Sequence, residues 1–282
     1  MMKKVTVVGL CGQSVFLKGK AISQIGETKI YDEMHVELGG KGVNSALTIH
    51  RLGGNVKFLT ALGKDSYGRE CKEFFGFENF NATIIERDGT KTDYGVILTD
   101  EDGNNSVSVY QDASKNMTAK DLSCFEDKIK ESDYLLTQAE MKDEILLEIA
   151  KICKKSGTKI IFDPSPAREF PKEFLQNVWL FTPNETEYEN LFKQITPKRV
   201  VITKGGQSVQ LIENGVKTTF EVEKVVARNT TGAGDVFNGA LLFSLSNDVS
   251  LSDAIRFAIK ASAFKVQSKY VIDGIPTQKD LL

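Results

Sequence analysis

Short apolar runs that alternate with helical patterns are the feature that most constrains the fold of this chain. The runs lie at residues 5–10, 56–62, 94–99, 133–137, 159–163, 178–182, 199–203 and 209–212. Several are apolar throughout, which is typical of strands that are covered on both faces. Patterns with helical spacing lie between them, at residues 41–53, 66–76, 141–157 and 185–192. This alternation predicts an α/β fold with three layers, α/β/α, around a mostly parallel central sheet.

Two regions interrupt this alternation. Residues 13–38 and about 88–112 are β-like and rich in turn residues, without long helical patterns. They predict a small β-sheet lid apart from the main sheet, and ordinary surface hairpins are the alternative. Beyond residue 235, two apolar helical segments predict a helical hairpin whose apolar positions belong to the core. Because the chain shows no repeat and no Pro-rich linker, we expect residues 1–282 to form a single domain.

Composition narrows the class of partner. Of the 282 residues 41% are hydrophobic and 26% charged, with a formal net charge of −2, so nothing indicates binding to nucleic acid or to a membrane surface. No apolar run approaches the roughly 18 residues of a membrane span. The four cysteines form no C-x-x-C pair and are expected to be reduced thiols of a cytoplasmic protein. A small molecule is therefore the expected partner.

The segment "NTTGAGDVFNGALL", residues 229–242, contains the first candidate site. Gly232, Ala233 and Gly234 allow an exposed turn, and the helix predicted to follow would present unpaired N–H groups and a partial positive charge. Such a turn binds anions, above all phosphate. A lone carboxylate such as Asp235 is most often a helix cap. Beside an anion site, however, it would repel phosphate unless it accepts a proton from an attacking hydroxyl.

A second glycine-rich turn, "ELGGKGVNSALTIHRLGG", covers residues 37–54. Gly39, Gly40 and Gly42 precede a predicted helix, while Lys41 and Asn44 supply polar side chains. The segment does not satisfy the P-loop pattern. It is either a polyol site, in which backbone donors and the Asn amide bind hydroxyls, or only the start of a helix.

The third candidate is "TPNETE", residues 182–187, with "ITKGG", residues 202–206, after the next strand. Asn184 and Glu187 lie three residues apart on one face of a starting helix, where they can hold a hydrated Mg²⁺ on a nucleotide. An N-cap with a capping box explains the same spacing equally well. The run from Thr203 through Lys204, Gly205 and Gly206 can likewise be a hairpin turn.

The order of these motifs along the chain is more specific than any one of them. "GGKGVN" early, "PNETE" in the middle, "ITKGG" after a strand and "GAGDVFNGAL" late resemble the PfkB (ribokinase-like) carbohydrate kinases. The resemblance covers nearly the whole chain, and "DPSPAREFP" together with "TPNETE" is most similar to the ribokinase branch. It implies a parallel-rich sheet between helices with a small β lid over the sugar, at residues 13–38 and 88–112.

The resemblance also implies roles for individual residues. Asp235 would be the general base for a primary hydroxyl of the substrate that attacks the γ-phosphate of ATP, and the amides of Gly232, Ala233 and Gly234 would stabilise the transferring phosphoryl group. The positions that match sugar-binding residues are Gly39, Gly40, Lys41, Asn44, Glu140 and Asp235. The positions that match the nucleotide side are Asn184, Glu187, Thr203, Lys204, Gly205, Gly206 and Gly234, with Glu187 and Asn184 near Mg²⁺, through water.

Two departures from the family pattern bear on the substrate and on cations. Aligned on Gly9, ribokinases carry an Asn and an Asp where this chain has Gly12 and Ser14, which argues against ribose as the substrate. Asn229 stands where the family usually has an Asp of a monovalent-cation site, and the tail "QSKYVIDGIP" lacks the usual glycine and serine ligands. We therefore expect little activation by K⁺.

An ATP-dependent sugar kinase is the leading hypothesis. A nucleoside kinase on the same fold is the first alternative, because the altered site after the first strand could admit a base. A non-catalytic sugar or nucleotide sensor is the second, and an intact Asp235 between glycines argues against it. A small lid sheet with wet edges also predicts a homodimer formed through the lid.

Overall fold

The central sheet of the computed structural model, which describes residues 2–101 and 105–282, is mostly parallel. Within the described residues its strand order is β13-β12-β11-β10-β9-β8-β1-β4-β5. From β5 to β11 all neighbouring strands are parallel, while β12 and β13 add an antiparallel edge. The strands are β1 (Val5–Val8), β4 (Val56–Gly63), β5 (Ala82–Arg87), β8 (Tyr134–Gln138), β9 (Lys159–Asp163), β10 (Val178–Phe181), β11 (Arg199–Thr203), β12 (Ser208–Glu213) and β13 (Val216–Glu221).

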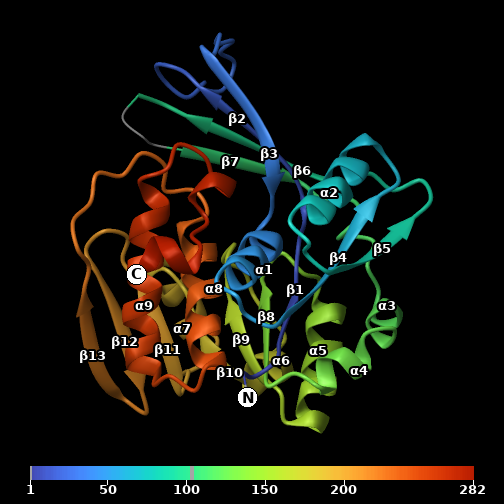
Figure 1. Ribbon diagram of the computed structural model, residues 1–282, viewed down its shortest axis with the longest axis vertical. Coiled ribbons are helices and arrows are strands. Elements are labelled where there is room, and N and C mark those ends of the chain that lie inside the picture. Colours follow the sequence, from blue (N-terminus) through green and yellow to red (C-terminus); the bar gives the residue numbers. More distant parts are fainter. Residues whose placement is uncertain (1, 102–104) are drawn as a thin grey trace.

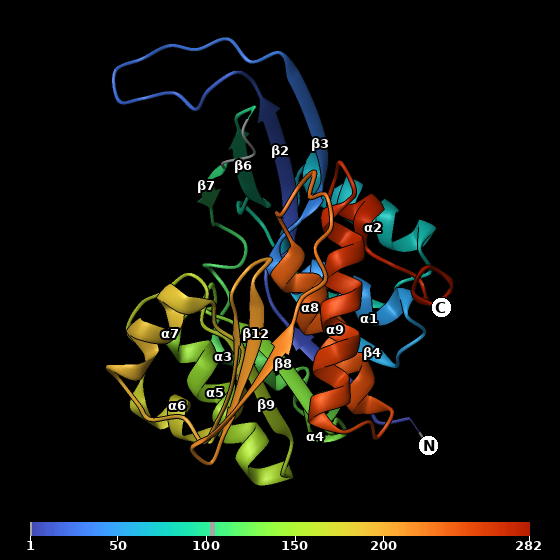
Figure 2. The same ribbon diagram turned by 90° about the vertical axis from the view of Figure 1, so that its left-hand side faces the viewer.

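Helices cover both faces of this sheet, which confirms the predicted three layers (Figures 1 and 2). One face carries α1 (Lys41–Arg51), α2 (Ser66–Phe77), α8 (Ala233–Ser246) and α9 (Leu251–Val266). The other carries α3 (Ala119–Ser123), α4 (Glu126–Lys130), α5 (Asp143–Ser156), α6 (Lys172–Asn177) and α7 (Glu185–Phe192). Two short 3₁₀ turns, Ile272–Gly274 and Gln278–Leu281, follow α9.

The apolar residues of the strands supply the core on both sides. In β1, Val5 and Val7 face the cluster built with α1, α8 and α9, and Val8 faces the cluster built with α5. All three side chains are completely buried. Burial on both faces explains why these strands read as continuous apolar runs rather than alternating ones.

A second sheet stands above the main body and forms the predicted lid (Figure 2). Its strand order is β3-β2-β6-β7, from β2 (Gly12–Lys18), β3 (Glu33–Gly39), β6 (Asp93–Thr99) and β7 (Asn105–Tyr110). The first predicted lid segment, residues 13–38, matches β2 and β3, and the second, 88–112, contains β6 and β7. Residues 102–104 of that second segment lie outside the described residues.

The helical hairpin predicted beyond residue 235 is also present, as α8 and α9. Sequence patterns missed the short helices α3, α4 and α6 and the edge strands β5 and β13. The three helices have five or six residues each, too few for a helical period to be recognised. The strands β5 and β13 lie at the edges of the sheet and are largely not buried, so neither forms a continuous apolar run. The main sheet brings the carboxyl ends of β1, β8, β9 and β11 to one edge, below the lid (Figure 1).

Candidate active site

The start of α8 places Asp235 in the site. Gly232 is the N-cap residue, with a left-handed backbone at φ 77°. A Cβ there would lie 2.7 Å from Cγ1 of Val271, so both the conformation and the space require glycine. Asp235 is the third residue of the helix and is only 6% exposed. Its Oδ2 accepts a hydrogen bond of 2.8 Å from Nδ2 of Asn44, which fixes the carboxylate at the helix terminus.

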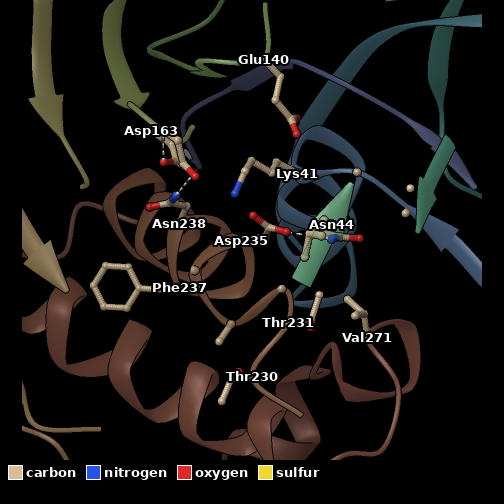
Figure 3. A pocket seen from close by; sticks show the side chains of 18 of the residues that line it. Lys41, Asn44, Glu140, Asp163, Thr230, Thr231, Asp235, Phe237, Asn238 and Val271 are labelled. Carbon is tan, nitrogen blue, oxygen red and sulfur yellow. Dashed lines mark hydrogen bonds between the residues drawn. The ribbon is translucent and has the colours of Figure 1, made fainter. Parts of the chain in front are cut away.

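The start of α1 brings Lys41 and Asn44 to the same place. Gly40 is its N-cap at φ 118°, and a Cβ on Gly40 would lie 2.6 Å from the carbonyl oxygen of Leu10. A Cβ on Gly42 would lie 2.5 Å from the backbone of Gly9. These glycines therefore let the first turn of α1 lie directly against the end of β1. The helix then directs Lys41 and Asn44 towards Asp235 (Figure 3).

A charged cluster fills the centre of the site. Lys41 extends into the space between Asp163 and Asp235, with Glu140 on its other side (Figure 3). Burial lowers the pKa of Lys41, but the carboxylates of Asp163, Asp235 and Glu140 outweigh that effect, so the pKa is raised and the ammonium stays charged. One cation is thus shared among three carboxyl groups.

Two carboxyl groups of this cluster, Glu140 and Asp163, are correspondingly hard to ionise. Burial raises the pKa of Glu140 to about 8; the Lys41 charge opposes the shift and Asp235 adds to it. Burial likewise raises the pKa of Asp163 to about 7, again against the effect of Lys41. Oε2 of Glu140 is enclosed and has no hydrogen-bond partner among the described residues. Shifted carboxyl groups and unpaired buried oxygens together indicate a binding or catalytic site.

The predicted nucleotide-side residues lie at the ends of β10 and β11. Asn184 is the N-cap of α7: its Oδ1 accepts from the N–H of Glu187 at 2.9 Å, and its own N–H donates to Oε2 of Glu187 at 2.8 Å. The capping-box interpretation is therefore confirmed. Glu187 nevertheless lines the same cavity as Asp235.

The hairpin interpretation of "ITKGG" is confirmed as well. Thr203 ends β11, and Gly205, with φ 54°, lies in the turn to β12. Thr203, Gly205 and Gly206 line the cavity. Lys204 is not among the cavity-lining residues; its Nζ pairs with Glu185 at 2.7 Å.

The lid contributes the remaining predicted positions. Gly12 pairs with Asp93 across β2 and β6, and a Cβ on Gly12 would lie 2.0 Å from the carbonyl oxygen of Asp93. A Cβ on Gly39 would lie 1.9 Å from Oγ of Ser14. Glycine at both positions is thus required by strand packing. Ser14 lies on the lid face that lines the cavity.

One continuous cavity of about 1840 Å³ joins these parts. It is larger than the pocket that a single small ligand usually occupies. The cavity-lining residues predicted from the sequence are Gly12, Ser14, Gly39, Gly40, Lys41, Asn44, Glu140, Asn184, Glu187, Thr203, Gly205, Gly206, Gly232, Ala233, Gly234 and Asp235.

Three polar residues of the site were missed. Asp163 ends β9, and its Oδ2 lies 3.5 Å from Nδ2 of Asn238, which comes one turn after Asp235. Asp93 is completely buried, and its Oδ1 accepts from the N–H of Asp112 at 2.8 Å. A carboxylate directly after an apolar run was the available signal for Asp163, because ligands bind where parallel strands end. Asp93 gave no comparable signal.

No helix in the described ranges, 2–101 and 105–282, is long and apolar enough to cross a membrane. Over the same ranges no group of three or more His, Cys, Asp and Glu side chains could hold a metal ion.

Comparison with known proteins gives one consistent result. The family model of the pfkB family carbohydrate kinases matches residues 2–278 of this chain. A protein of Lactococcus lactis named ribokinase is 32% identical over 286 residues, covering 98% of this chain and 94% of the relative.

Two solved structures agree. The crystal structure of a ribokinase from Thermotoga maritima is 31% identical, with a TM-score of 0.88, and the match covers 99% of this chain and 98% of the other. The Arabidopsis thaliana ribokinase complexed with ribose and ATP is 25% identical, with a TM-score of 0.86, covering 100% and 98%. By the extent of the match and the geometry of its site, this chain belongs to the pfkB family of carbohydrate kinases.

Proposed function

We propose that this chain transfers the γ-phosphate of ATP to the primary hydroxyl of a sugar or sugar-like alcohol, with Asp235 as the general base. The observation that carries the proposal is the position of Asp235. It lies in the cavity at the N-terminus of α8, next to the exposed Gly234 and held by Asn44 at 2.8 Å. A base at this point can take a proton from a hydroxyl that attacks a phosphoryl group bound by the helix terminus.

The site has two sets of groups with different tasks: backbone amides at the start of α8 for the phosphoryl group, and polar side chains for the substrate. The amides of Gly232 and Gly234 would stabilise the charge that develops on the transferring phosphoryl group. The N–H of Ala233, expected from the sequence to join them, donates instead to the carbonyl of Thr230 at 3.2 Å. The Lys41 ammonium lies near Asp235 and Glu140, so it can bind substrate oxygens while it balances the carboxylates. Oδ1 of Asn44 and Oε2 of Glu140, both buried without a partner among the described residues, are acceptors suited to sugar hydroxyls.

ATP is proposed for the side of the cavity lined by Thr203, Gly205 and Gly206. The Arabidopsis relative, whose structure is a complex with ribose and ATP, supports ATP as the phosphoryl donor. Mg²⁺ is proposed beside Glu187 and Asn184, through water, where its charge would neutralise the nucleotide phosphates. The fit is chemical: carboxylate and amide oxygens are suitable acceptors for its coordinated water. The capping box uses one lone pair on each of the two side-chain oxygens, Asn184 Oδ1 and Glu187 Oε2.

The identity of the sugar is left to experiment. The relatives are named ribokinase, but Gly12 and Ser14 stand where an Asn and an Asp are expected for ribose. A nucleoside kinase remains the alternative substrate assignment, and a non-catalytic sensor the alternative class. ADP release measured against pentoses, hexoses, their phosphates and nucleosides separates the three. Turnover of a sugar supports the proposal, turnover of nucleosides alone replaces it, and ATP binding without any turnover indicates a sensor.

The decisive variant is Asp235→Asn. We expect it to fold and to lose at least about 100-fold in kcat, the lower range for removal of a general base. Asp253→Asn is a matched control, because Asp253 is an exposed carboxylate at the third position of the neighbouring helix α9. Near-normal turnover by Asp235→Asn, measured as ADP release, would exclude Asp235 as the base.

We also propose a homodimer formed through the lid. Residues paired across strands project from the same face of a sheet, so Leu17, Met34, Val36, Val96 and Leu98 share the face opposite the cavity. Met34 is 70% exposed and Val36 40%, so a second lid packed against this face would bury both side chains. The proposed location is the cytoplasm, a choice supported by the four free cysteines. A single kinase domain over residues 1–282 is part of the same proposal.

A further inference from the structure

A lysine is buried directly behind the anion-binding turn. Lys265, in the last turn of α9, is 0% exposed and is among the largest fully buried side chains of the described residues. Burying an ammonium group carries a large free-energy cost unless it meets hydrogen-bond acceptors or opposite charge. A side chain in this position therefore requires an explanation beyond packing.

The ammonium group is directed at the loop that precedes Asp235. Its Nζ donates to the carbonyl oxygen of Asn229 at 2.8 Å. The same loop is tied to α9 through its backbone, because the N–H groups of Arg228 and Asn229 donate to the carbonyl of Val266 at 2.7 and 3.1 Å. Lys265 thus joins the C-terminal end of α9 to the loop at residues 228–231, which leads into Gly232 and the start of α8.

The side chain of Asn229 completes this junction. Its Nδ2 donates to the carbonyl of Lys269 at 2.9 Å, and its Oδ1 accepts from the N–H of Thr231 at 2.9 Å. One turn away, Oγ of Ser262 donates to the carbonyl of Ala233 at 3.1 Å. Every residue from 228 to 233 therefore has a described hydrogen bond that sets its backbone, with Gly232 accepting from the N–H of Val236 at 3.0 Å. Lys265 supplies the one positive charge among these contacts.

The helix end and two carboxylates offset part of the cost of burying a cation here. The last turn of a helix carries partial negative charge, and carbonyl oxygens converge on it. Burial lowers the pKa of Lys265 to about 8, opposed by the carboxylates of Glu37 and Asp235, so the group remains mostly charged at neutral pH. Glu37 itself accepts from the N–H groups of Val271 and Ile272 and holds the following segment against the lid.

We infer that Lys265 is a positioning residue whose ammonium group performs, from within the chain, the task of a bound monovalent cation beneath the anion-binding turn. It balances the partial negative charge of the Asn229 carbonyl, keeps the turn that carries the N–H groups of Gly232 and Gly234 in place, and puts a fixed positive charge behind the phosphoryl group. This accounts for Asn229 at a position where the family resemblance implies an Asp. The inference rests on the proposed kinase function.

The test compares Lys265→Met and Lys265→Ala with a matched control. Methionine keeps the volume of the side chain without its charge, and alanine leaves room for a small cation. Lys260→Met is the control, because Lys260 also lies on α9 and donates to a backbone carbonyl, that of Leu281, away from the loop. Turnover is measured in buffers whose only monovalent cation is K⁺, Na⁺, ammonium or the bulky tetramethylammonium.

We expect the unaltered enzyme to have the same kcat, within about twofold, in all four buffers. Lys265→Met should lower kcat about 10- to 100-fold, the scale of an electrostatic contact near a developing charge, with little change in sugar KM. Its melting temperature should not fall, because an uncharged side chain fills the same space. Lys265→Ala should lose activity in tetramethylammonium and recover at least about tenfold in ammonium or K⁺.

Three results would overturn the inference: full kcat in Lys265→Met, no recovery of Lys265→Ala by any small cation, or a large loss of kcat in the unaltered enzyme when K⁺ is removed. A readout without turnover keeps it testable if the kinase proposal fails. The melting temperature of Lys265→Ala should rise with ammonium or K⁺ but not with tetramethylammonium, while that of the unaltered chain should be the same in all three. Absence of this stabilisation would contradict the role of Lys265 in place of a cation. Absence of ADP release with every substrate tested would instead contradict the proposed kinase function.

Discussion

At the scale of single residues, one ammonium group, that of Lys41, balances several carboxyl groups of the site. Lys41 lies among Asp163, Asp235 and Glu140, and Asn44 donates to Asp235 at 2.8 Å. The amide of Asn44 thus occupies one oxygen of the base, and the rest of the carboxylate can receive a proton. Such a cluster is arranged for a ligand with several hydroxyls, and without the ligand it costs stability.

This cost predicts a pH effect for Glu140→Gln. The pKa of Glu140 is raised from 4.5 to about 8, so the folded chain binds this proton more tightly than the unfolded chain does. The free energy of unfolding therefore falls as pH rises from about 4.5 to 8, and the loss is complete above pH 8. We expect Glu140→Gln to melt roughly 2 °C or more above the unaltered chain at pH 8.5, with no difference near pH 5.

Differential scanning fluorimetry without ligands, over pH 5 to about 9, measures this effect. Glu144→Gln is the matched control, because Glu144 is an exposed carboxylate on the adjacent helix α5. A Glu140→Gln curve parallel to that of the unaltered chain would show that Glu140 ionises normally in the fold.

At the scale of elements, the start of α8 contains two glycines with different roles: Gly232 is required by the backbone conformation, and Gly234 leaves open space. Gly232 needs its left-handed backbone, and a Cβ would lie 2.7 Å from Val271. A Cβ on Gly234 would meet nothing within 4 Å, apart from the chain neighbours and the local helix backbone. Gly232→Ala should therefore lower the free energy of unfolding by about 1–3 kcal/mol. Gly234→Ala should leave it unchanged or raise it by up to about 1 kcal/mol.

Both variants should nevertheless lower kcat, since the open space at Gly234 is where the phosphoryl group would approach the helix. Urea denaturation and ADP release measure the two effects separately. Full activity in Gly234→Ala would show that the phosphoryl group stays away from this residue, and unaltered stability in Gly232→Ala would contradict its assignment as an obligatory glycine.

The sequence was most informative for elements with a continuous apolar run or with a cluster of turn residues. Continuous apolar runs identified the buried strands, and turn-rich segments identified the lid. Spacing alone left "PNETE" undecided between a cap and a metal site, and the fold shows the cap while bringing Glu187 to the cavity as well. Lys265 could not be assigned from sequence, because its significance comes from a long-range contact with Asn229. Asp163 offered one signal, its place directly after an apolar run, but its contact with Asn238 is evident only in the fold.

At the scale of the whole molecule, the cavity lies where the carboxyl ends of the parallel strands meet the lid (Figures 1 and 2). The main sheet supplies residues such as Asp163 from a rigid edge, whereas Ser14 and Asp93 come from the lid. The lid is a small sheet of the described strands β3, β2, β6 and β7, with β3 and β7 at its edges. The main body covers its cavity face only in part, since Val107 and Val109 there are about half exposed, and its opposite face carries exposed Met34 and Val36.

The opposite face of the lid predicts the assembly state. If two lids pack through it, Val36→Glu places a charge in an apolar interface, and the dimer should dissociate. Multi-angle light scattering should then give about twice 31.2 kDa for the unaltered chain and the single mass for Val36→Glu. Val216→Glu is the matched control, because Val216 is a 69% exposed valine on β13, an edge strand of the main sheet, and should remain dimeric. A monomeric unaltered chain, or a dimer that Val36→Glu leaves intact, would rule out this interface.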